Sequence, residues 1–278
     1  MGQTESQAAH LILTPDGGNR LLVRDLWRYR ELLMFLAWRE VLLRYKQAFF
    51  GVAWALMRPV LTMLVFTVIF GRVVGFDAGG VPYSLFALSG MLVWQFFSTC
   101  VADASNSLLA NTSLVTKVFF PKLILPTSFA VVNFLDLGVA SLFFVGLWIF
   151  KGTPAPGPLW ALPACLLWML LLTLGFSYAL AAASVRFRDV KFLVPFMLQL
   201  GLYASPIGYP ISAIPERWRM ALYLNPVSGL VEAWRWSIFG IAPTDNAGVM
   251  VSLGLSLLVF VGGFRFFRKS EANFADLI

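Results

Sequence analysis

Six long apolar runs limit what this chain can fold into more than any other feature. They cover residues 49–71, 83–102, 125–150, 159–184, 192–209 and 247–264. A helix rises about 1.5 Å per residue, so roughly 20 apolar residues cross the hydrocarbon core of a bilayer. Of the 278 residues, 59% are hydrophobic and only 13% are charged. The sequence therefore predicts an all-α integral membrane protein with six transmembrane helices, of which the run 192–209, broken by Pro195 and Gly201, is the weakest.

The basic residues predict the orientation of these spans. Fifteen of the 21 lysines and arginines lie on the side of the two termini and five on the other side, with Arg58 inside the first run. Because Lys and Arg are retained in cytoplasmic loops, both termini are expected in the cytoplasm. The net charge of +7 then reflects topology rather than nucleic-acid binding. Residues 1–20 are predicted to be a flexible cytoplasmic tail, and residues 48–278 the transmembrane domain.

Residues 21–47 are predicted to form an amphipathic interfacial helix between the tail and the first span. The charged residues that share an arc of roughly 80° at 100° per residue are Arg24, Arg28, Glu31, Arg39 and Lys46. Phe35 and Leu42 interrupt this arc, and a helix docked against protein would show the same loose pattern. Docking on the membrane surface is favoured, and binding to a partner comes second.

The segment 204–240 is neither a span nor an ordinary loop. It contains Pro206, Pro210, Pro215 and Pro226, together with the large rings of Tyr209, Trp218, Tyr223, Trp234 and Trp236. Irregular backbone persists at membrane depth only where protein or a water-filled cavity satisfies its polar groups. The two pieces that begin with proline, 215–224 and 226–239, are therefore predicted to be short re-entrant helices between spans five and six. Topology places them away from the cytoplasm, as a candidate exit gate.

Two ionisable residues, Arg58 and Asp136, fall well inside apolar runs, where an unpaired charge is costly. Their depths from the cytoplasmic ends of their runs are similar, roughly 14 and 17 Å at helical rise. Two explanations stay open. The two charges either pair or face a hydrated channel; alternatively, Arg58 reaches back to the headgroups while Asp136 is neutral and hydrogen-bonded.

Several kinds of catalytic chemistry have no support in the sequence. There is no GxxxxGK[ST] phosphate loop, no HExxH arrangement, and the single histidine, His10, lies in the polar tail. Cys100 and Cys165 both sit in apolar runs, which does not suggest a disulfide framework. The chain is therefore not predicted to be an enzyme, and no metal or cofactor is expected in it. A membrane-embedded enzyme acting on a lipid-linked sugar is the second hypothesis.

Several motifs, in their order along the chain, resemble a known family. They include RYKQAFFGVAWALMRPVLTMLVFTVIFGR at 44–72, SNSLLANTSLVTKVFFPKLILP at 105–126, IPERWRMALYLNPVSGLVEAWRWSIFG at 214–240 and the tail FRKSEANFADLI. Together they are similar to the membrane subunits of ABC-type polysaccharide exporters, the ABC-2 permeases, from about residue 39 to the end. The SLVTKVFFPK block and the tail look most like the exporters of lipopolysaccharide O-antigen. Capsule and teichoic acid permeases are the nearest alternatives.

This resemblance implies a bacterial inner-membrane permease that forms a homodimer. Two copies of a separate ATP-binding subunit would bind ATP and Mg and supply the energy. The implied cargo is a polysaccharide on a polyprenyl diphosphate lipid, moved from the cytoplasm to the periplasm.

The resemblance also assigns roles to particular residues. Coupling to the ATPase subunit is implied for the loop after the second span, at Asn111, Leu114, Val115, Lys117, Val118, Phe119, Phe120 and Lys122. A helix that merely rests on lipid is the alternative. The cations expected to receive the lipid diphosphate are Arg39, Arg44, Lys46 and Arg58, with anionic lipid headgroups as the alternative partners.

Aromatic residues are expected to line the glycan path, because flat rings give sugars a sliding contact. The candidates are Trp94, Phe97, Tyr203, Tyr209, Trp218, Tyr223, Trp234 and Trp236. Tyr203, Trp218 and Tyr223 are favoured because they lie on or beside the broken segment. For the others, a place in the aromatic belt at the membrane boundary is the stronger explanation.

Overall fold

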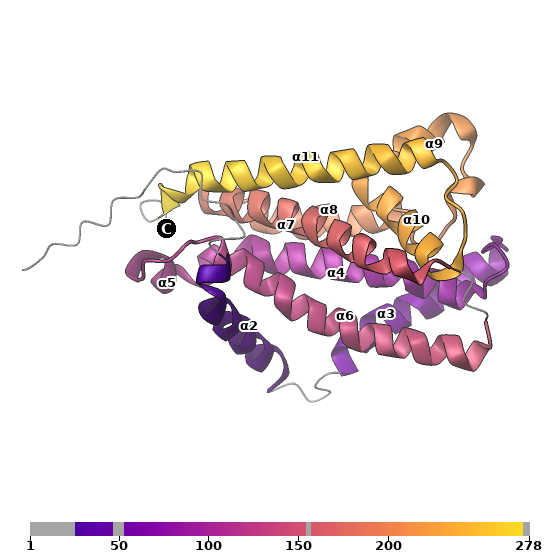
Figure 1. Ribbon diagram of the computed structural model, residues 1–278, viewed down its shortest axis with the longest axis horizontal. Coiled ribbons are helices and arrows are strands. Elements are labelled where there is room, and N and C mark those ends of the chain that lie inside the picture. The colour runs from indigo at the N-terminus through magenta and orange to yellow at the C-terminus, as the bar shows by residue number, and fades with distance from the viewer. Residues whose placement is uncertain (1–25, 47–52, 154–156, 275–278) are drawn as a thin grey trace, which may run out of the picture.

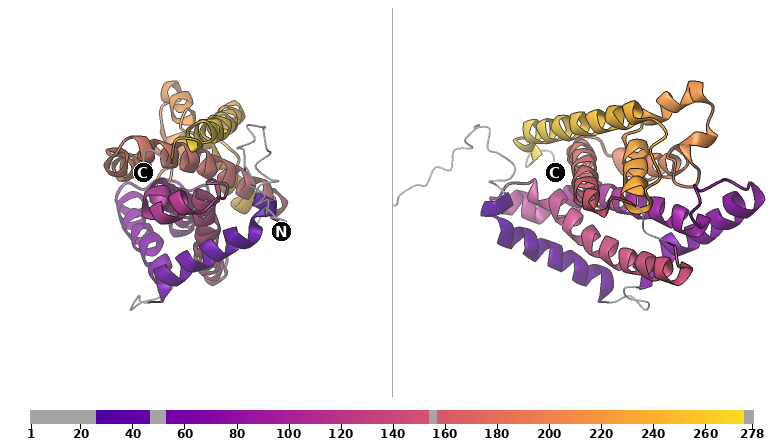
Figure 2. Two further views of the ribbon diagram at one scale, coloured as in Figure 1. Left: turned by 90° about the vertical axis from the view of Figure 1, so that its left-hand side faces the viewer. Right: turned by 45° about the vertical axis from the view of Figure 1, so that its right-hand side comes forward.

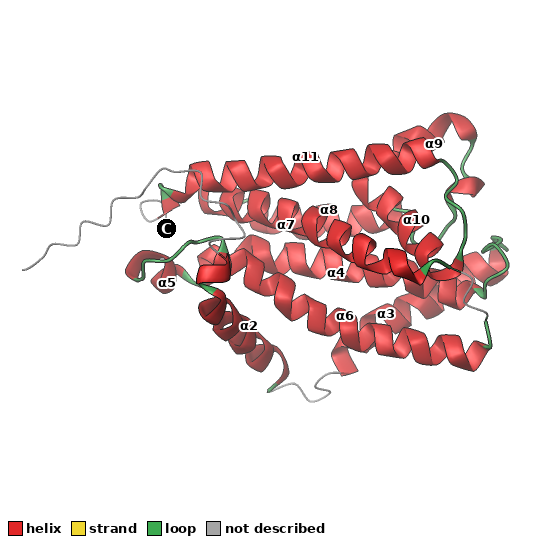
Figure 3. Cartoon of the chain, in the orientation of Figure 1, coloured by secondary structure: helices red, strands yellow, loops and turns green. Residues whose placement is uncertain are grey.

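The computed structural model describes residues 26–46, 53–153 and 157–274. All regular structure within these ranges is helical (Figure 3). In chain order the elements are α2 (Arg30–Tyr45), α3 (Ala53–Phe66), η1 (Thr67–Val73), α4 (Tyr83–Ala110), α5 (Thr112–Lys117), α6 (Ile124–Lys151), η2 (Leu159–Ala161), α7 (Leu162–Arg186), α8 (Val190–Ala204), η3 (Ile211–Ala213), α9 (Glu216–Tyr223), α10 (Pro226–Phe239) and α11 (Asn246–Glu271). The long helices α4, α6, α7 and α11 run along the length of the molecule (Figure 1).

Within the described residues, five helical stretches are long and apolar enough to cross a membrane. They are Leu56–Val73, Tyr83–Ala110, Ile124–Lys151, Leu159–Arg186 and Asn246–Glu271. The fifth predicted span, 192–209, overlaps α8, a helix of 15 residues that begins at Val190 and ends at Ala204. Its length of about 22 Å is less than the roughly 30 Å of the hydrocarbon core. The membrane-protein class is thus confirmed in its helical form, and the crossing of the membrane by the fifth predicted span stays a prediction.

Helix α4 is the central element of the bundle. It is 78% buried over its most apolar stretch, compared with 17% for the span at Leu56–Val73 and 22% for α11. Its neighbours α6 and α7 pack along it, as the end-on view of Figure 2 illustrates. The glycines of α7 and α11 allow a close approach, since a Cβ on Gly263 would lie 2.1 Å from the carbonyl oxygen of Gly175. Small residues at such crossings let helix backbones touch.

Helix α2 leaves the bundle at one end and packs against α6 (Figures 1 and 2). Leu36 and Ala37 are buried on this face. Phe35 and Trp38 stay exposed on the rest of its surface, as does Trp27 just before the helix. The predicted helix is therefore present over 30–45 and docks on protein with one face. The first 20 residues of the chain, with the predicted tail and His10, lie outside the described residues.

Helices α9 and α10 match the two pieces predicted to begin with proline. Pro226 occupies the first turn of α10, and the side chain of Asn225 caps this helix by accepting a hydrogen bond from the backbone N–H of Val227, at 3.1 Å. Gly240 ends it with φ of 70°, a left-handed conformation that favours glycine. Both helices lie at the end of the molecule opposite α2 and α5 (Figure 1). Their re-entrant position in a membrane stays a prediction.

Candidate functional site

An open cleft of about 720 Å³ lies between α2, α3, α4 and α6. Eight of its ten lining residues are polar or charged, and the other two are apolar residues of α3. The lining residues are Arg44, Tyr45, Met57, Arg58, Leu61, Thr62, Gln95, Thr99, Asp103 and Asp136. The cleft thus brings together Arg44, Arg58 and Asp136, which the sequence analysis had singled out.

Arg44 holds two carboxylates from two different helices at the inner wall of the cleft. Its Nη2 donates to Oδ2 of Asp103 at 2.5 Å, and its Nη1 donates to Oδ2 of Asp136. The hydroxyl of Tyr45 donates to the other oxygen of Asp136. Burial alone would lower the pKa of Arg44, but Asp103 and Asp136 together raise it. Burial and Asp136 raise the pKa of Tyr45 to about 12, so this hydroxyl stays protonated and keeps donating at neutral pH.

The predicted pair between Arg58 and Asp136 is not formed, because Asp136 is taken by Arg44. The last turn of α2 carries Arg44 to the depth of Asp136, which periodicity within one span cannot reveal. Arg58 is exposed, and no ion pair joins it to a carboxylate within residues 26–46, 53–153 and 157–274. The alternative in which both residues face a hydrated channel fits better, since Arg58 and Asp136 line the same open cleft.

Asp103 was not predicted as a site residue, because it lies just beyond the apolar run 83–102. The second span is longer than that run, because α4 continues to Ala110 and carries Asp103 inside the bundle. Leu108 and Ala104, both fully buried, lie on the same extension. Apolar residues recurring at helical spacing after Ala102 were the signal that could have extended the prediction.

We expect Arg44→Met to lower the stability of the protein by about 2 kcal/mol, because it leaves Asp103 and Asp136 without their shared cation. This loss of stability is smaller than that for a fully buried ion pair, because the three side chains are between 19% and 31% exposed. Thermal unfolding in detergent measures the effect. Adding Asp103→Asn and Asp136→Asn to the same variant is expected to restore most of the loss. An unchanged melting temperature for Arg44→Met alone would show that the cluster contributes nothing.

The other two cations proposed for the diphosphate lie outside the cleft. Arg39 donates from Nη2 to Glu40 Oε1 at 2.5 Å and to Asn111 Oδ1 at 2.6 Å. This contact joins α2 to the junction between α4 and α5, so Asn111 has a partner inside the chain. Lys46 follows the last residue of α2 and is exposed.

The loop after α4, predicted to couple to the ATPase subunit, presents only part of its apolar surface. Phe119 is 68% exposed and Val118 is 47% exposed, whereas Val115 and Phe120 are buried. Leu114 is partly buried against the same cluster, and Lys117 points outward in the last turn of α5. Phe120 therefore packs inside the chain in this conformation, and its role in docking stays a prediction.

The same loop is tied to the C-terminal end of α11. The backbone N–H of Lys122 donates to Glu271 Oε1 at 2.7 Å. Phe120 belongs to the buried cluster that also contains Phe267 and Phe274. The Lys122 ammonium donates to the Val118 carbonyl at 2.8 Å, and burial lowers the pKa of Lys122 while Glu271 opposes that shift. The loop and the end of α11 therefore form one packed unit.

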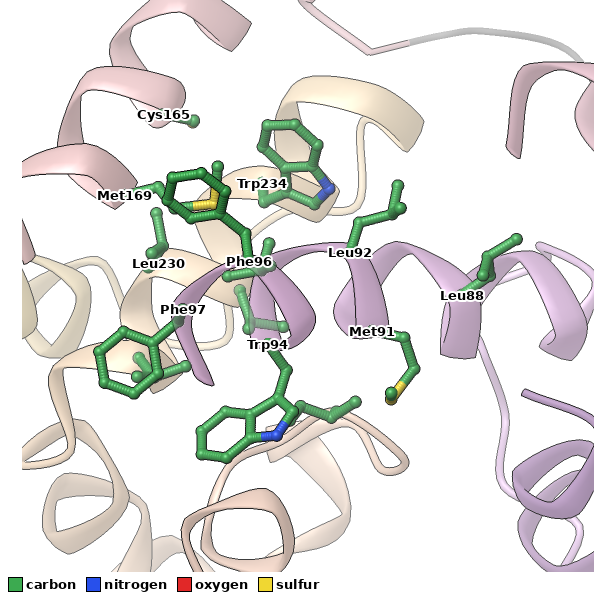
Figure 4. Close-up of a cluster of buried hydrophobic side chains, with 14 of the residues drawn as sticks. Leu88, Met91, Leu92, Trp94, Phe96, Phe97, Cys165, Met169, Leu230 and Trp234 are labelled. Carbon is green, nitrogen blue, oxygen red and sulfur yellow. The ribbon is translucent and has the colours of Figure 1, made fainter. Parts of the chain in front are cut away.

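The aromatic residues expected along a glycan path divide into three groups. Trp94, Phe97, Tyr223 and Trp234 are buried and offer no surface to a glycan in this conformation. Figure 4 shows Trp94 and Trp234 on opposite sides of α4, each among apolar side chains. Tyr203 and Trp218 are exposed, while Tyr209 and Trp236 are half-buried.

Tyr223, one of the three favoured candidates, is fully buried and has a structural role. Its hydroxyl donates to Glu232 Oε2 at 2.5 Å and accepts from the backbone N–H of Asp245 at 3.1 Å. Burial and the nearby Glu232 raise the pKa of Tyr223. An amphipathic ring looks the same in sequence whether it faces a path or links two helices, which is why the sequence could not separate these roles.

Comparison with known proteins places residues 31–239 in a match to ABC-2 type transporters. The chain is 31% identical to an O-antigen export system permease protein of Myxococcus xanthus, over 92% of this chain and 99% of that protein. It is 25% identical to an O-antigen export system permease protein of Klebsiella pneumoniae, over 89% of this chain and 95% of that protein. It is also 22% identical to a polysialic acid transport protein of Escherichia coli, over 84% of this chain and 91% of that protein.

Proposed function

Because this chain belongs to the ABC-2 type transporter family, we propose that it is the membrane permease of an ATP-driven polysaccharide exporter. The cargo we propose is O-antigen on a polyprenyl diphosphate lipid, moved from the cytoplasm to the periplasm across the bacterial inner membrane. The observation that carries this proposal is the match to an O-antigen export permease over 99% of that protein's length. The match to a polysialic acid transport protein keeps capsule export as the second candidate.

The partners proposed are a second copy of this chain and two copies of a separate ATP-binding subunit. The exposed Phe119 and Val118 support docking of that subunit on the loop after α4. The connection of this loop to α4, α6 and the end of α11 gives a docked subunit a mechanical path into the bundle. ATP and Mg would then be held by the partner, and this chain would take no chemical step itself.

The cleft between α2, α3, α4 and α6 is the proposed receiving site for the lipid diphosphate. Arg58 is its best cation, because its guanidinium is exposed and Arg44 is already held by two carboxylates. A guanidinium matches phosphate oxygens in a bidentate geometry. Met57 and Leu61 supply apolar surface beside it for the first part of a lipid chain. Arg44 then shapes the wall of the cleft and does not bind the substrate directly.

We expect Arg58→Ala to reduce ATP-driven translocation about tenfold at low substrate concentration, because a charge-assisted contact to the diphosphate is lost. The loss should appear as a higher KM with little change in kcat. Reconstituted vesicles containing the complete exporter and lipid-linked glycan provide the measurement. Lys46→Ala removes an exposed cation outside the cleft and is expected to leave KM unchanged. Equal KM values for Arg58→Ala and the unaltered protein would rule out this role.

The exit path is proposed to run beside α9 and the end of α8, where Tyr203 and Trp218 expose their rings. Tyr209 and Trp236, both half-buried, are secondary candidates at the same end. The four buried rings drop out of the proposed path. Their packing supports the helices that carry the exposed rings.

Deleting the gene for this chain tests the function in the organism that encodes it. The proposal expects surface polysaccharide to disappear while complete lipid-linked polymer accumulates inside the cell. Mass spectrometry of the accumulated polymer identifies O-antigen, capsule or teichoic acid. Truncated polymer, without accumulation of the complete form, would favour the alternative of a membrane-embedded enzyme.

A further inference from the structure

Arg235 on α10 is a buried cation that the proposed transport function leaves unused. Its side chain is 3% exposed. No carboxylate forms an ion pair with it in the described part of the chain. A buried charge is normally paired with an opposite charge, because desolvation is costly. Arg235 is satisfied in another way, and this sets it apart from the surface arginines of the same end.

Most partners of Arg235 are backbone carbonyls of two separate segments, and its Nε also donates to the Ser89 hydroxyl of α4 at 3.5 Å. Its Nη1 donates to the carbonyl of Pro206 at 2.7 Å, and its Nη2 donates to the carbonyl of Ile207 at 2.7 Å. Nη2 also donates to the carbonyl of Phe86 in the first turn of α4, at 3.2 Å. The guanidinium carbon lies 3.5 Å from the centroid of the Phe86 ring. One side chain of α10 thus binds the start of α4 to the stretch that follows α8.

That stretch comprises Ala204, the last residue of α8, and residues 205–208, which hold no regular structure, and side chains satisfy most of its carbonyls. Asn225 donates from Nδ2 to the Ala204 carbonyl at 3.4 Å and to Ser205 Oγ at 2.9 Å. The Tyr83 hydroxyl donates to the Gly208 carbonyl. Together with Arg235, these donors come from α4, α10 and the turn before α10. They meet the requirement that irregular backbone at membrane depth be satisfied by protein.

The fit around Arg235 is close on the α4 side as well. A Cβ added at Gly90 would lie 2.7 Å from Nη2 of Arg235 and 3.2 Å from Ile207. The backbone of α4 therefore approaches both the guanidinium and the bound stretch, and glycine at position 90 makes room for them. Arg235, Gly90 and residues 206–207 form one interlocking contact.

We propose that Arg235 is the positioning residue of the exit end, which locks residues 204–208 to α4 and α10. The lock makes the end of α8, α10 and the start of α4 move as one body. An opening that separates α10 from α4 must first break the carbonyl bonds of Arg235. The description of this end as an exit rests on the proposed function, whereas the lock itself is a property of the fold.

The accessibility of residue 205 tests the lock. Ser205 is completely buried, so the thiol introduced by Ser205→Cys is expected to react slowly with a water-soluble maleimide. Cys100 and Cys165 are also buried and contribute little background. Adding Arg235→Lys, which keeps the charge but loses the fork geometry, is expected to raise the labelling rate about tenfold. Arg235→Gln should raise it further.

Arg219→Lys is the matched control for this experiment. Arg219 of α9 also donates to backbone carbonyls, those of Ile214 at 2.9 Å and Ser212 at 3.1 Å, but both belong to the segment directly before α9. It is expected to leave the labelling rate unchanged. The proposal is overturned if Arg235→Lys and Arg235→Gln label at the same rate as the protein that keeps Arg235. It is also overturned if Arg219→Lys raises the labelling rate as much as Arg235→Lys does.

A second variant decides the question if the Arg235 variants do not fold. Tyr83→Phe removes the donor to the Gly208 carbonyl and leaves Arg235 in place. An intermediate rise in labelling is expected, and an unchanged rate would overturn the lock. Labelling of the complete exporter in vesicles needs no transported cargo. A negative result here and a failed transport assay are therefore distinguishable.

Discussion

Gly263→Ala is expected to destabilise the protein at or above the upper end of the range of about 1–3 kcal/mol seen for overpacked interiors. The added methyl carbon would lie 2.1 Å from the carbonyl oxygen of Gly175, and 2.9 Å from its carbonyl carbon. These are backbone atoms, so no rotamer change can relieve the overlap. Helices α7 and α11 would have to separate along a contact that extends over much of their length. The melting temperature in one fixed detergent measures the loss.

Gly262→Ala provides the matched control on the same helix. A Cβ at Gly262 meets nothing within 4 Å, and alanine favours a helix over glycine by about 1 kcal/mol. This variant is expected to melt at or slightly above the temperature of the unaltered protein. If both variants melt at the same temperature, the close approach of α7 and α11 is not a determinant of stability.

Phe119→Asp is expected to reduce ATP-driven export about tenfold or more, since it places a charge at the centre of the proposed docking surface. The side chain is 68% exposed, so folding should survive the change. Export and ATP turnover by the complete exporter in vesicles are the two measurements. Thr116→Asp adds the same charge on the exposed side of α5 and is expected to have a smaller effect. Unaltered turnover and export in Phe119→Asp would sink the coupling role of this loop.

Phe120→Ala separates docking from packing in the same loop. Phe120 is 6% exposed and packs in the cluster with Phe267 and Phe274. Its truncation should therefore lower the melting temperature, as expected for a buried aromatic. Phe119→Asp is expected to spare the melting temperature and affect export. The two neighbouring phenylalanines are thus expected to differ: the change at Phe120 lowers stability, and the change at Phe119 lowers export.

Local signals in the sequence were sufficient for the helices whose ends are marked chemically. Pro215, Pro226 and Gly240 delimit α9 and α10, and these helices occupy the predicted pieces almost residue for residue. The long apolar runs likewise became α4, α6, α7 and α11. Proline and glycine act on their own backbone, so their effects can be read without knowing what packs nearby.

Contacts between distant helices could not be predicted in the same way. Asp136 has Arg44 as its partner because α2 folds back against α6, which no periodicity within either segment encodes. In the sequence, Arg235 is one of the five basic residues on the side away from the termini, and nothing there indicates that it is buried and bonded to the carbonyls of Phe86 and Ile207. The sequence showed that costly charges are present. The fold decides which groups satisfy them.

The central place of α4 has a consequence for how this chain can diverge over evolutionary time. A substitution on α4 disturbs its packing against α6, α7 and α10, since these helices all contact it. Helices α3 and α11 instead turn most of their apolar surface outward. Lipid tails accept any apolar shape, whereas a packed interior accepts few. Neutral drift is therefore expected to concentrate at the periphery of the bundle, and α4 is expected to change most slowly.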